Sequence, residues 1–256
     1  MTATNTTTAL PLSFAGKTAF VTGGSRGIGA AIVRRLARQG AHVVFTYQSS
    51  SNEAEALAAA VRADGGQAQA VKADAADAQA LSAAVSEAAK LTGKLDILVN
   101  NAGVFVPGAI DDFSLEDFDK TLAVNVRAVF VAIKAAVPLM PSGGRIINIG
   151  STNAHRMPFA GAAAYAMSKS ALSGLTQGLS RDLGPRGITI NNVEPGPVAT
   201  DMNPPTGDFA DLMHGLMALP RHGTGEEIAG MVAYLASEEA AFVTGAGLKI
   251  DGGFAA

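Results

Sequence analysis

Short apolar segments typical of β-strands alternate with segments of helical spacing along this chain, and this alternation limits the fold more than any other feature. The strand-like segments are almost continuously apolar, as parallel strands buried on both faces are. They lie at Lys17–Thr22, His42–Tyr47, Ala68–Lys72, Leu95–Val99, Arg145–Ile149 and Thr189–Val193. Helical segments lie between them at Gly27–Gln39, Glu53–Ala63, Asp77–Lys90, Leu115–Val137 and Ala163–Leu183. The pattern predicts an α/β fold, a doubly wound parallel sheet of about seven strands with helices on both faces.

This pattern fits one domain. A chain of 256 residues, 48% of them hydrophobic, can bury one large core, and no linker rich in Pro, Gly and Ser divides it. We expect the domain to span residues 14–256, with a mobile lid near 202–220 whose Asn203-Pro204-Pro205 and Gly207 are hinge or plain turn residues. Residues 1–13 are rich in Thr and lack the basic region of a signal peptide, so we expect a disordered leader.

The composition argues against several classes of function. The formal net charge of −3 is unlike that of proteins that bind nucleic acid by neutralising phosphates. The absence of cysteine excludes disulfides, thiol catalysis and cysteine-ligated zinc, and the four histidines show no metal-ligand spacing. No uninterrupted apolar run approaches the ~18 residues of a membrane span. We therefore expect a cytoplasmic protein that binds no metal, no nucleic acid polymer and no membrane.

A glycine-rich turn follows the first predicted strand, with the sequence Thr22-Gly23-Gly24-Ser25-Arg26-Gly27-Ile28-Gly29. Glycines let the backbone approach a pyrophosphate closely, and the N–H groups at the start of the next helix favour an anion. The alternative is a tight strand-to-helix turn without a ligand. The spacing also departs from the commoner G-x-G-x-x-G pattern.

Tyr165 and Lys169 are four residues apart in a predicted helix, which places them one turn apart on one face. An ammonium group beside a phenol favours the phenolate and so lowers the pKa of tyrosine, which is ordinarily about 10. Such a tyrosine could give or take a proton near neutral pH. The alternative is an ordinary amphipathic helix in which the spacing has no chemical role.

Five motifs in order, from Lys17 to Gly253, resemble the short-chain dehydrogenase/reductase family. The glycine-rich turn resembles the TGxxxGxG signature, and Asn100-Asn101-Ala102-Gly103 resembles NNAG. Pro195-Gly196 with Thr200 resembles the nicotinamide-side segment, and Asp251-Gly252-Gly253 resembles the C-terminal end. The positions that match the family's catalytic residues are Asn125, Ser151, Tyr165 and Lys169. The resemblance implies a single-domain Rossmann fold and a nicotinamide cofactor.

The end of the second strand indicates which nicotinamide cofactor is bound. An acidic residue there would hydrogen-bond the adenosine 2′-OH and repel a 2′-phosphate. Residues 45–52 contain no carboxylate, and Arg26 can reach the same corner, which favours NADP(H) over NAD(H). At least one of Ser49–Ser51 could instead cap a helix. By resemblance Asp74 contacts adenine, although alone it would more often be a helix cap.

The predicted cofactor-binding residues are Gly23, Ser25, Arg26, Gly27, Ile28, Gly29, Tyr47, Ser49, Ser50, Asp74, Ala75, Asn101, Ala102, Gly103, Tyr165, Lys169, Pro195, Gly196, Val198 and Thr200.

The resemblance also implies catalytic roles. Tyr165 is the general acid in reduction and the general base in oxidation, and Lys169 lowers its pKa and holds the nicotinamide ribose. Ser151 orients the substrate oxygen, and Asn125 supports Lys169 through a water. The interval from Ser151 to Tyr165 is one residue longer than in many members, and Thr152 would fit the shorter interval. Ile149-Gly150-Ser151 matches the family's strand end better, so Ser151 is assigned.

The substrate side is less determined by the sequence. Asn153, His155, Met157 and Phe159 precede Tyr165, and Met202–Leu219 resembles the family's variable lid. Apolar residues with Met suggest a small or medium carbonyl compound. His155 could contact a ligand or be a plain surface residue.

We predict an NADPH-dependent carbonyl reductase or alcohol dehydrogenase, similar to 3-oxoacyl-acyl-carrier-protein reductases. The alternative is a regulatory protein, because Arg156–Leu172 and Gly184–Pro197 resemble a bacterial subgroup that includes a cyclic-di-GMP-binding mediator of biofilm dispersal.

Members of the family commonly form tetramers through their long helices. Ala128–Val137 and Ala171–Leu183 offer small and apolar residues for such contacts, namely Ala132, Ala135, Ala136, Leu172, Leu175 and Leu179. The alternative is that these side chains only cover the sheet. We expect a homotetramer, with a dimer as the second choice.

Overall fold

Seven strands form a single sheet at the centre of the protein, whose computed structural model describes residues 13–256. The strand order is β3-β2-β1-β4-β5-β6-β7, and all six pairings are parallel. The strands are β1 (Thr18–Val21), β2 (His42–Tyr47), β3 (Gln67–Lys72), β4 (Ile97–Asn100), β5 (Arg145–Ile149), β6 (Thr189–Pro195) and β7 (Gly247–Ile250). The predicted doubly wound parallel sheet is confirmed.

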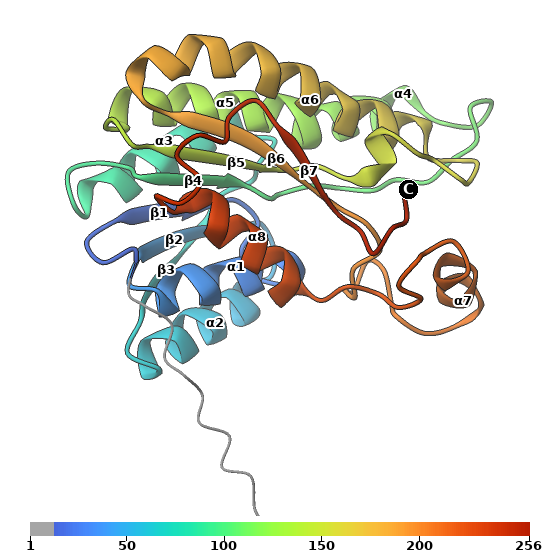
Figure 1. Cartoon of the computed structure of the whole chain (residues 1–256), viewed down its shortest axis with the longest axis horizontal. Helices are drawn as coiled ribbons and strands as arrows, with labels where there is room; N and C mark the ends of the chain where they lie inside the picture. The colour runs from blue at the N-terminus through green and yellow to red at the C-terminus, as the bar shows by residue number, and fades with distance from the viewer. Residues whose placement is uncertain (1–12) are drawn as a thin grey trace, which may run out of the picture.

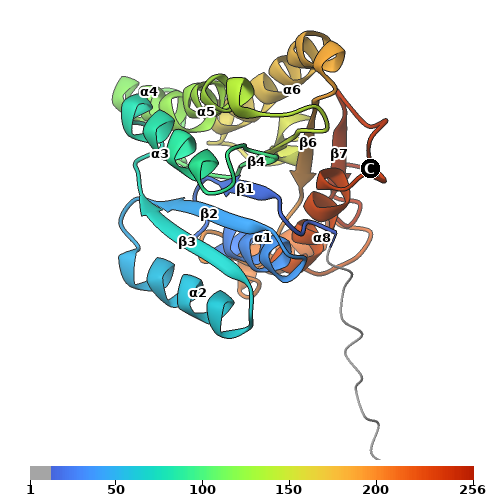
Figure 2. The same cartoon turned by 90° about the vertical axis from the view of Figure 1, so that its left-hand side faces the viewer.

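Helices cover both faces of the sheet, as Figure 1 and Figure 2 show. One layer contains α1 (Gly27–Arg38), α2 (Ser51–Ala63) and α8 (Gly225–Ala236), and the other contains α3 (Ala78–Lys90), α5 (Ala128–Ala136) and α6 (Ala163–Leu183). Each layer closes its own hydrophobic core over the sheet. The central strands β1, β4, β5 and β6 are buried along their whole length, which explains their continuous apolar runs.

The predicted element boundaries are close to the observed ones, with physical reasons for the differences. Helix α3 begins at Ala78 because the Asp77 side chain accepts from the backbone N–H groups of Gln79 and Ala80 and so acts as its N-cap. Helix α1 ends just before Gly40, whose φ of 96° only glycine adopts readily.

The predicted helix Leu115–Val137 is not one regular α-helix. It consists of α4 (Leu115–Leu122), a π-helical turn at Ala123–Arg127, α5, and a 3₁₀ turn at Val137–Leu139. The wider π turn contains Asn125, which is buried. Hydrophobic spacing does not distinguish a single π turn from α-helix, and such turns are frequent at functional sites.

The predicted leader falls almost entirely on residues 1–12, which lie outside the described residues. Ser13 is described, and its hydroxyl accepts a hydrogen bond from Gln39 Nε2 at 3.2 Å. Within residues 13–256, one continuous helical stretch, Leu115–Leu139, is long and apolar enough to cross a membrane by length and composition alone. In the fold this stretch packs against α3, α6 and β4.

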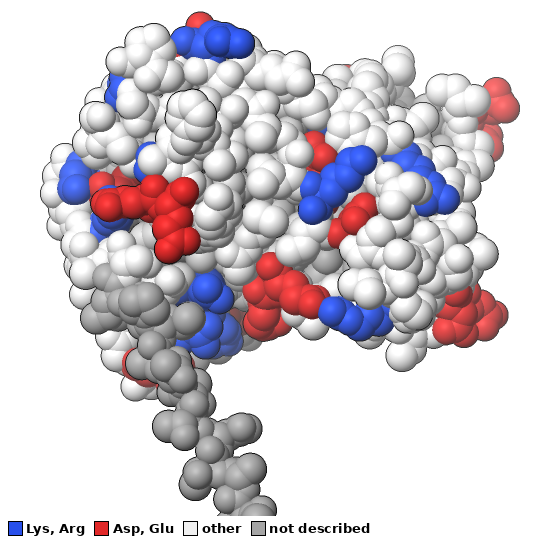
Figure 3. Space-filling view, viewed as in Figure 1, with Lys and Arg blue, Asp and Glu red and all other residues white. Residues whose placement is uncertain are grey.

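Charged side chains of both signs are scattered among uncharged residues on the face shown in Figure 3. That face carries no broad basic surface of the kind that binds a nucleic acid backbone.

A ladder of buried polar side chains joins helix α6 to the sheet. Asn100 on β4, Asn148 on β5 and Asn192 on β6 occupy matching positions of adjacent strands. Asn100 Nδ2 donates to Asn148 Oδ1 at 2.8 Å, and Asn148 Nδ2 donates to Thr176 Oγ1 of α6 at 3.1 Å. Thr176 Oγ1 in turn donates to Asn192 Oδ1 at 2.7 Å. The ladder therefore fixes where α6 lies across the strands.

We expect Thr176→Val to destabilise the protein although its volume is nearly conserved. The substitution leaves the Asn148 amide and the Asn192 carbonyl buried without a partner, at a cost on the order of 2–4 kcal/mol. Urea unfolding followed by circular dichroism measures the change.

Thr189→Val is the matched control, because the buried Thr189 hydroxyl has no hydrogen-bond partner among the described residues. Its removal should change the free energy of unfolding little or raise it. Equal losses in the two variants would contradict the importance of the ladder.

Candidate active site

A large cavity lies at the carboxyl ends of the strands, where β1 and β4 are neighbours and the strand order reverses. Ligands of open α/β sheets bind at such a position. The cavity has a volume of about 660 Å³, within the range of small-molecule sites. All of the predicted cofactor-binding residues line it, as do Ser151, Tyr165 and Lys169. Among the predicted catalytic and cofactor-binding residues, Asn125 alone does not line the cavity.

The glycine-rich turn forms a tight cradle at the start of α1. A Cβ atom on Gly29 would lie 2.2 Å from the carbonyl oxygen of Gly23, and one on Gly24 would lie 2.5 Å from Cβ of Phe45. Larger residues therefore cannot take these places without moving the backbone. Arg26 occupies the N-cap position of α1 and makes no side-chain cap bond, so the first N–H groups of the helix stay available to an anion.

Asn101 and Thr22 join the ends of β4 and β1 beneath this cradle. Asn101 Nδ2 donates to the carbonyl oxygens of Thr22 and Gly23 at 3.0 and 2.8 Å. The Thr22 hydroxyl accepts from the backbone N–H groups of Asn101 and Ala102, both at 3.0 Å. The NNAG segment thus holds the glycine-rich turn in place as well as lining the cavity.

The part of the cavity beside the end of β2 is lined by polar groups, and the end of that strand carries no carboxylate. Tyr47, Ser49 and Ser50 all line the cavity there, and Arg26 lines it from the glycine-rich turn. Ser50 is the N-cap residue of α2, but its side chain makes no cap bond. Arg26 lies 3.6 Å from Asp201, and both side chains are largely exposed.

Asp74 does not cap a helix. Its carboxylate accepts from Gln48 Nε2 at 2.7 Å and from the backbone N–H of Ala76 at 2.9 Å. It therefore closes the far end of the cavity across from β2.

Ser151, Tyr165 and Lys169 meet on the opposite side of the cavity. Tyr165 and Lys169 lie one turn apart in α6, with Lys169 Nζ 5.7 Å from the Tyr165 ring centroid. Lys169 Nζ also donates to the carbonyl oxygen of Ile149 at 2.8 Å. Ser151 follows β5, and its hydroxyl interacts with the Tyr165 phenol. The neighbouring Thr152 hydroxyl instead donates to the carbonyl oxygen of Pro195 at 3.1 Å, so the geometry favours Ser151 for chemistry.

Burial controls the protonation of this group. It raises the pKa of Tyr165 above its ordinary value, and the interaction with Ser151 opposes that rise. It lowers the pKa of Lys169 from 10.5 to about 8. The pKa of Tyr165 is therefore not lowered overall, because removal of the phenolate from water outweighs the interaction with Ser151, and the influence of Lys169 on that pKa stays a prediction.

Asn125 contacts helix α6 and holds the chain at Val104, beside the cavity. Its side chain makes a reciprocal pair with the backbone N–H and carbonyl of Val104, both at 2.9 Å, and donates to Ser168 Oγ at 3.0 Å. No direct hydrogen bond joins it to Lys169 among the described contacts. A Cβ atom on Gly103 would lie 3.5 Å from both Asn125 Oδ1 and Lys169 Nζ, so the two groups approach the same backbone position.

Aromatic and Met side chains line the end of the cavity where the sequence predicts the substrate. Phe105 packs edge-on against Tyr165 with centroids 5.2 Å apart, and Phe159 lies 5.3 Å from Phe209. Asn153, Met157 and Phe159 line the cavity as predicted, together with Met202, Phe209, Met213 and Phe254. Phe105 and Phe254 were not predicted, because no pattern marks a single aromatic residue after a motif as a cavity residue.

The predicted lid segment contains helix α7 (Asp208–His214), which brings Phe209 and Met213 to the cavity. His214 Nε2 lies 2.7 Å from Nδ1 of the buried His222, and burial and His214 together lower the pKa of His222. This pair joins α7 to the chain that follows it. His155 does not line the cavity, and it pairs with Glu194 instead.

Comparison with known proteins gives the same family throughout. The sequence model described as enoyl-(acyl carrier protein) reductase matches residues 23–255. The cyclic-di-GMP-binding biofilm dispersal mediator protein of Escherichia coli strain K12 is 52% identical, over 95% of this chain and 99% of its own.

Solved structures agree closely with this fold. A short-chain dehydrogenase/reductase from Serratia marcescens BCRC 10948 is 62% identical with a TM-score of 0.94, over 95% of this chain and 100% of that one. A short-chain dehydrogenase from Burkholderia cenocepacia J2315 in complex with NADP is 52% identical with a TM-score of 0.94, over the same shares. Motifs, sheet topology and these matches agree, and the chain belongs to the short-chain dehydrogenase/reductase family.

Proposed function

We propose that the protein is an NADP(H)-dependent carbonyl reductase, which also oxidises the corresponding secondary alcohols. The observation that carries the proposal is that Ser151, Tyr165 and Lys169 line the same cavity as the glycine-rich turn. Proton-transfer groups and a dinucleotide cradle in one cavity are what carbonyl reduction requires. A chain that only sensed a nucleotide would have no use for a buried Tyr and Lys beside it.

The residues present fit NADP(H). The uncapped start of α1 and its glycines suit the pyrophosphate, and Arg26 with the hydroxyls of Tyr47, Ser49 and Ser50 suits a 2′-phosphate. Asp74 and Ala75 would border the adenine, and Val198 and Thr200 the nicotinamide side. A related structure of 52% identity holds NADP, which supports the assignment. The cofactor, when bound, supplies the hydride.

The chain's own groups supply orientation and the proton. The Ser151 hydroxyl would hydrogen-bond the substrate oxygen, and Tyr165 Oη would give that oxygen its proton. The Tyr165 phenol, whose pKa burial raises, carries at neutral pH the proton that it would give in the direction of reduction. One of the three N–H groups of Lys169 donates to the carbonyl oxygen of Ile149, which leaves two to bind hydroxyls of the cofactor ribose.

The substrate we propose is a small or medium ketone with an apolar or aromatic part. Phe105, Phe159 and Phe209 would contact that part, and the α7 segment would open and close over it as a lid. A panel of ketones and secondary alcohols, followed by NADPH absorbance, tests the proposal. Absence of turnover across the panel would contradict it.

A regulatory role is the second candidate, because the relative from Escherichia coli is named for binding cyclic-di-GMP. NADPH fluorescence with and without cyclic-di-GMP separates the two candidates. Competition between the nucleotides, without turnover on the panel, would favour the sensor.

We also propose a homotetramer. Ala132, Ala136 and Leu172 are buried in the core of the protomer, so only part of the predicted contact set is free for assembly. Phe130 on α5 is half-exposed and Phe242 is fully exposed, which offers further apolar surface.

The predicted cytoplasmic location stays a prediction.

Tyr165→Phe should reduce turnover by orders of magnitude while NADPH binding is retained. The substitution removes the proton donor and keeps the ring that packs against Phe105. Steady-state kinetics and NADPH fluorescence titration measure the two effects. Turnover near that of the wild type would rule out Tyr165 as the proton donor.

Arg26→Ala should raise the KM for NADPH much more than the KM for NADH. Loss of a charge-assisted bond to a phosphate costs on the order of 1.5–3 kcal/mol. Arg34→Ala, an exposed arginine on the same helix, is the matched control. Equal changes for both cofactors would mean that the 2′-phosphate is held elsewhere.

Lys169→Met should change how stability depends on pH. Between the folded pKa of about 8 and the ordinary value of 10.5, the unfolded chain keeps a proton that the folded protein has released. Wild-type stability relative to Lys169→Met should therefore rise with pH in this window, by up to about 1.4 kcal/mol per unit. Urea unfolding between pH 7 and 10 measures it, and parallel curves would contradict the burial of the charge.

Light scattering at micromolar concentration should report a mass about four times that of the 25.8 kDa chain. A mass near that of one chain would refute the tetramer.

A further inference from the structure

Glu194 is a buried carboxylate next to the proposed cofactor segment. It lies in β6, directly before Pro195 and Gly196, which line the cavity, and its side chain is only 3% exposed. Two glycines, one on β7 and one just after β5, make room for it. A Cβ atom on Gly247 of β7 would lie 2.6 Å from Oε1, and one on Gly150, just after β5, would lie 3.3 Å from Cγ.

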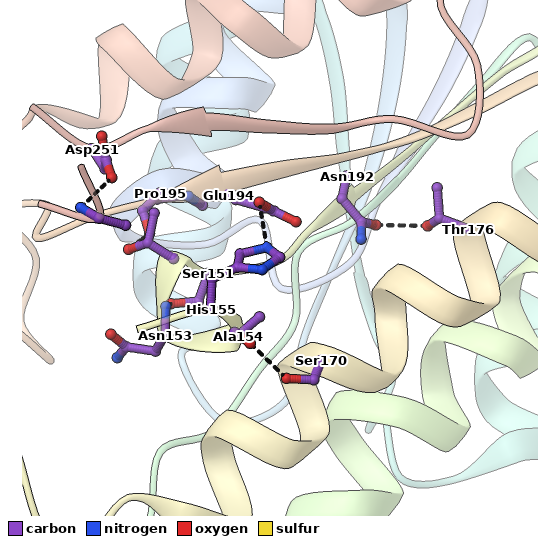
Figure 4. A network of polar contacts seen from close by, with 12 residues as sticks. Ser151, Asn153, Ala154, His155, Ser170, Thr176, Asn192, Glu194, Pro195 and Asp251 are labelled. Carbon is purple, nitrogen blue, oxygen red and sulfur yellow. Dashed lines mark hydrogen bonds and ion pairs between the residues drawn. The ribbon is translucent and has the colours of Figure 1, made fainter. Parts of the chain in front are cut away.

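The partner of this carboxylate is His155, with Nε2 2.9 Å from Oε2 (Figure 4). Among the described residues no other side chain is recorded in a hydrogen bond or ion pair with Glu194. The His155 side chain is 43% exposed, so the pair links a buried carboxylate to the surface, and a buried carboxylate that loses its hydrogen-bond partner is costly. This cost favours the arrangement in which His155 and Glu194 are paired.

His155 ends the short turn that begins at Ser151. Ser151 is the N-cap of the 3₁₀ turn Thr152–Ala154, and its hydroxyl accepts from the backbone N–H of Asn153 at 3.1 Å. Two further bonds hold the turn, from Thr152 Oγ1 to the carbonyl of Pro195 and from Ser170 Oγ to the carbonyl of Ala154. Of these three contacts that hold the turn, the His155–Glu194 pair is the one in which both partners are ionisable side chains.

We infer that His155, through its bond to Glu194, is a positioning residue that fixes Ser151 relative to the Pro195-Gly196 segment. The inference rests on the proposed carbonyl reduction, in which Ser151 orients the substrate oxygen. The pair connects the turn that begins at Ser151, which would orient the substrate, to the Pro195-Gly196 segment, which would contact the cofactor. Neither His155 nor Glu194 lines the cavity, so the pair acts only through its neighbours. Misplacement of a reacting group by about 1 Å can cost about 100-fold in rate.

The test compares His155→Ala with His155→Gln. Ala removes the donor, whereas the Gln amide can reach the same carboxylate. We expect His155→Ala to lower kcat by about 10- to 100-fold, with the dissociation constant for NADPH changed by less than about threefold. His155→Gln should recover kcat to within about threefold of the wild type. His42→Ala, at the start of β2 and the opposite end of the strands, is the control for loss of a histidine.

A double-mutant cycle checks that Glu194 is the partner. Glu194→Gln replaces the buried charge with an amide of the same shape. The double variant His155→Ala/Glu194→Gln should lose no more activity than His155→Ala alone, because a neutral amide tolerates the missing partner better than a carboxylate. Simple addition of the two losses would overturn the inference, as would a kcat for His155→Ala within twofold of the wild type.

Hydrogen–deuterium exchange separates this inference from the proposed function. In His155→Ala, but not in His155→Gln or His42→Ala, residues 151–156 and 194–198 should exchange faster. If the wild type turns over no ketone, the proposed function fails while the exchange result still decides whether the pair holds the two segments together. Unchanged exchange in His155→Ala would refute the tether.

Discussion

The arrangement of the site depends on the reversal of strand order between β1 and β4. Successive strands add outward on one side up to β3, and the chain then crosses to β4 and continues on the other side. The loops after β1 and β4 therefore separate and leave a cavity above the sheet. Thr22 and Asn101 hydrogen-bond across the base of that cavity, so the glycine-rich turn and the NNAG segment form one rigid floor.

Desolvation is the main influence on the pKa values of Tyr165 and Lys169, the proposed catalytic pair. The same burial raises the pKa of Tyr165 and lowers the pKa of Lys169, so both groups are biased toward their neutral forms. A lysine one turn from a tyrosine suggests the opposite for the phenol when only spacing is considered. The neutral phenol is the form that can donate a proton, which is the role that we propose for Tyr165.

Buried polar side chains position the elements that carry the site. The asparagine ladder fixes α6 on the sheet through Thr176, and α6 carries Tyr165 and Lys169. Asn125 fixes the chain at Val104 in the same manner from the π turn. Each bond satisfies groups that would be costly to leave unpaired, so it specifies one arrangement of the backbone rather than adding much net stability.

Local patterns in the sequence determined every strand except β7, most helices, the glycine-rich turn and the one-turn spacing of Tyr165 and Lys169, because each depends on residues close together in the chain. The π turn at Asn125, the partnership of His155 with Glu194 and the contact of Phe105 with Tyr165 were decided by the tertiary structure. The last two contacts join residues that lie 39 or more positions apart in the chain. The π turn depends on a local backbone geometry that hydrophobic spacing does not reveal. The tertiary structure also decided the direction of the pKa shifts of Tyr165 and Lys169, since burial is a property of the packed molecule and not of the spacing of two side chains.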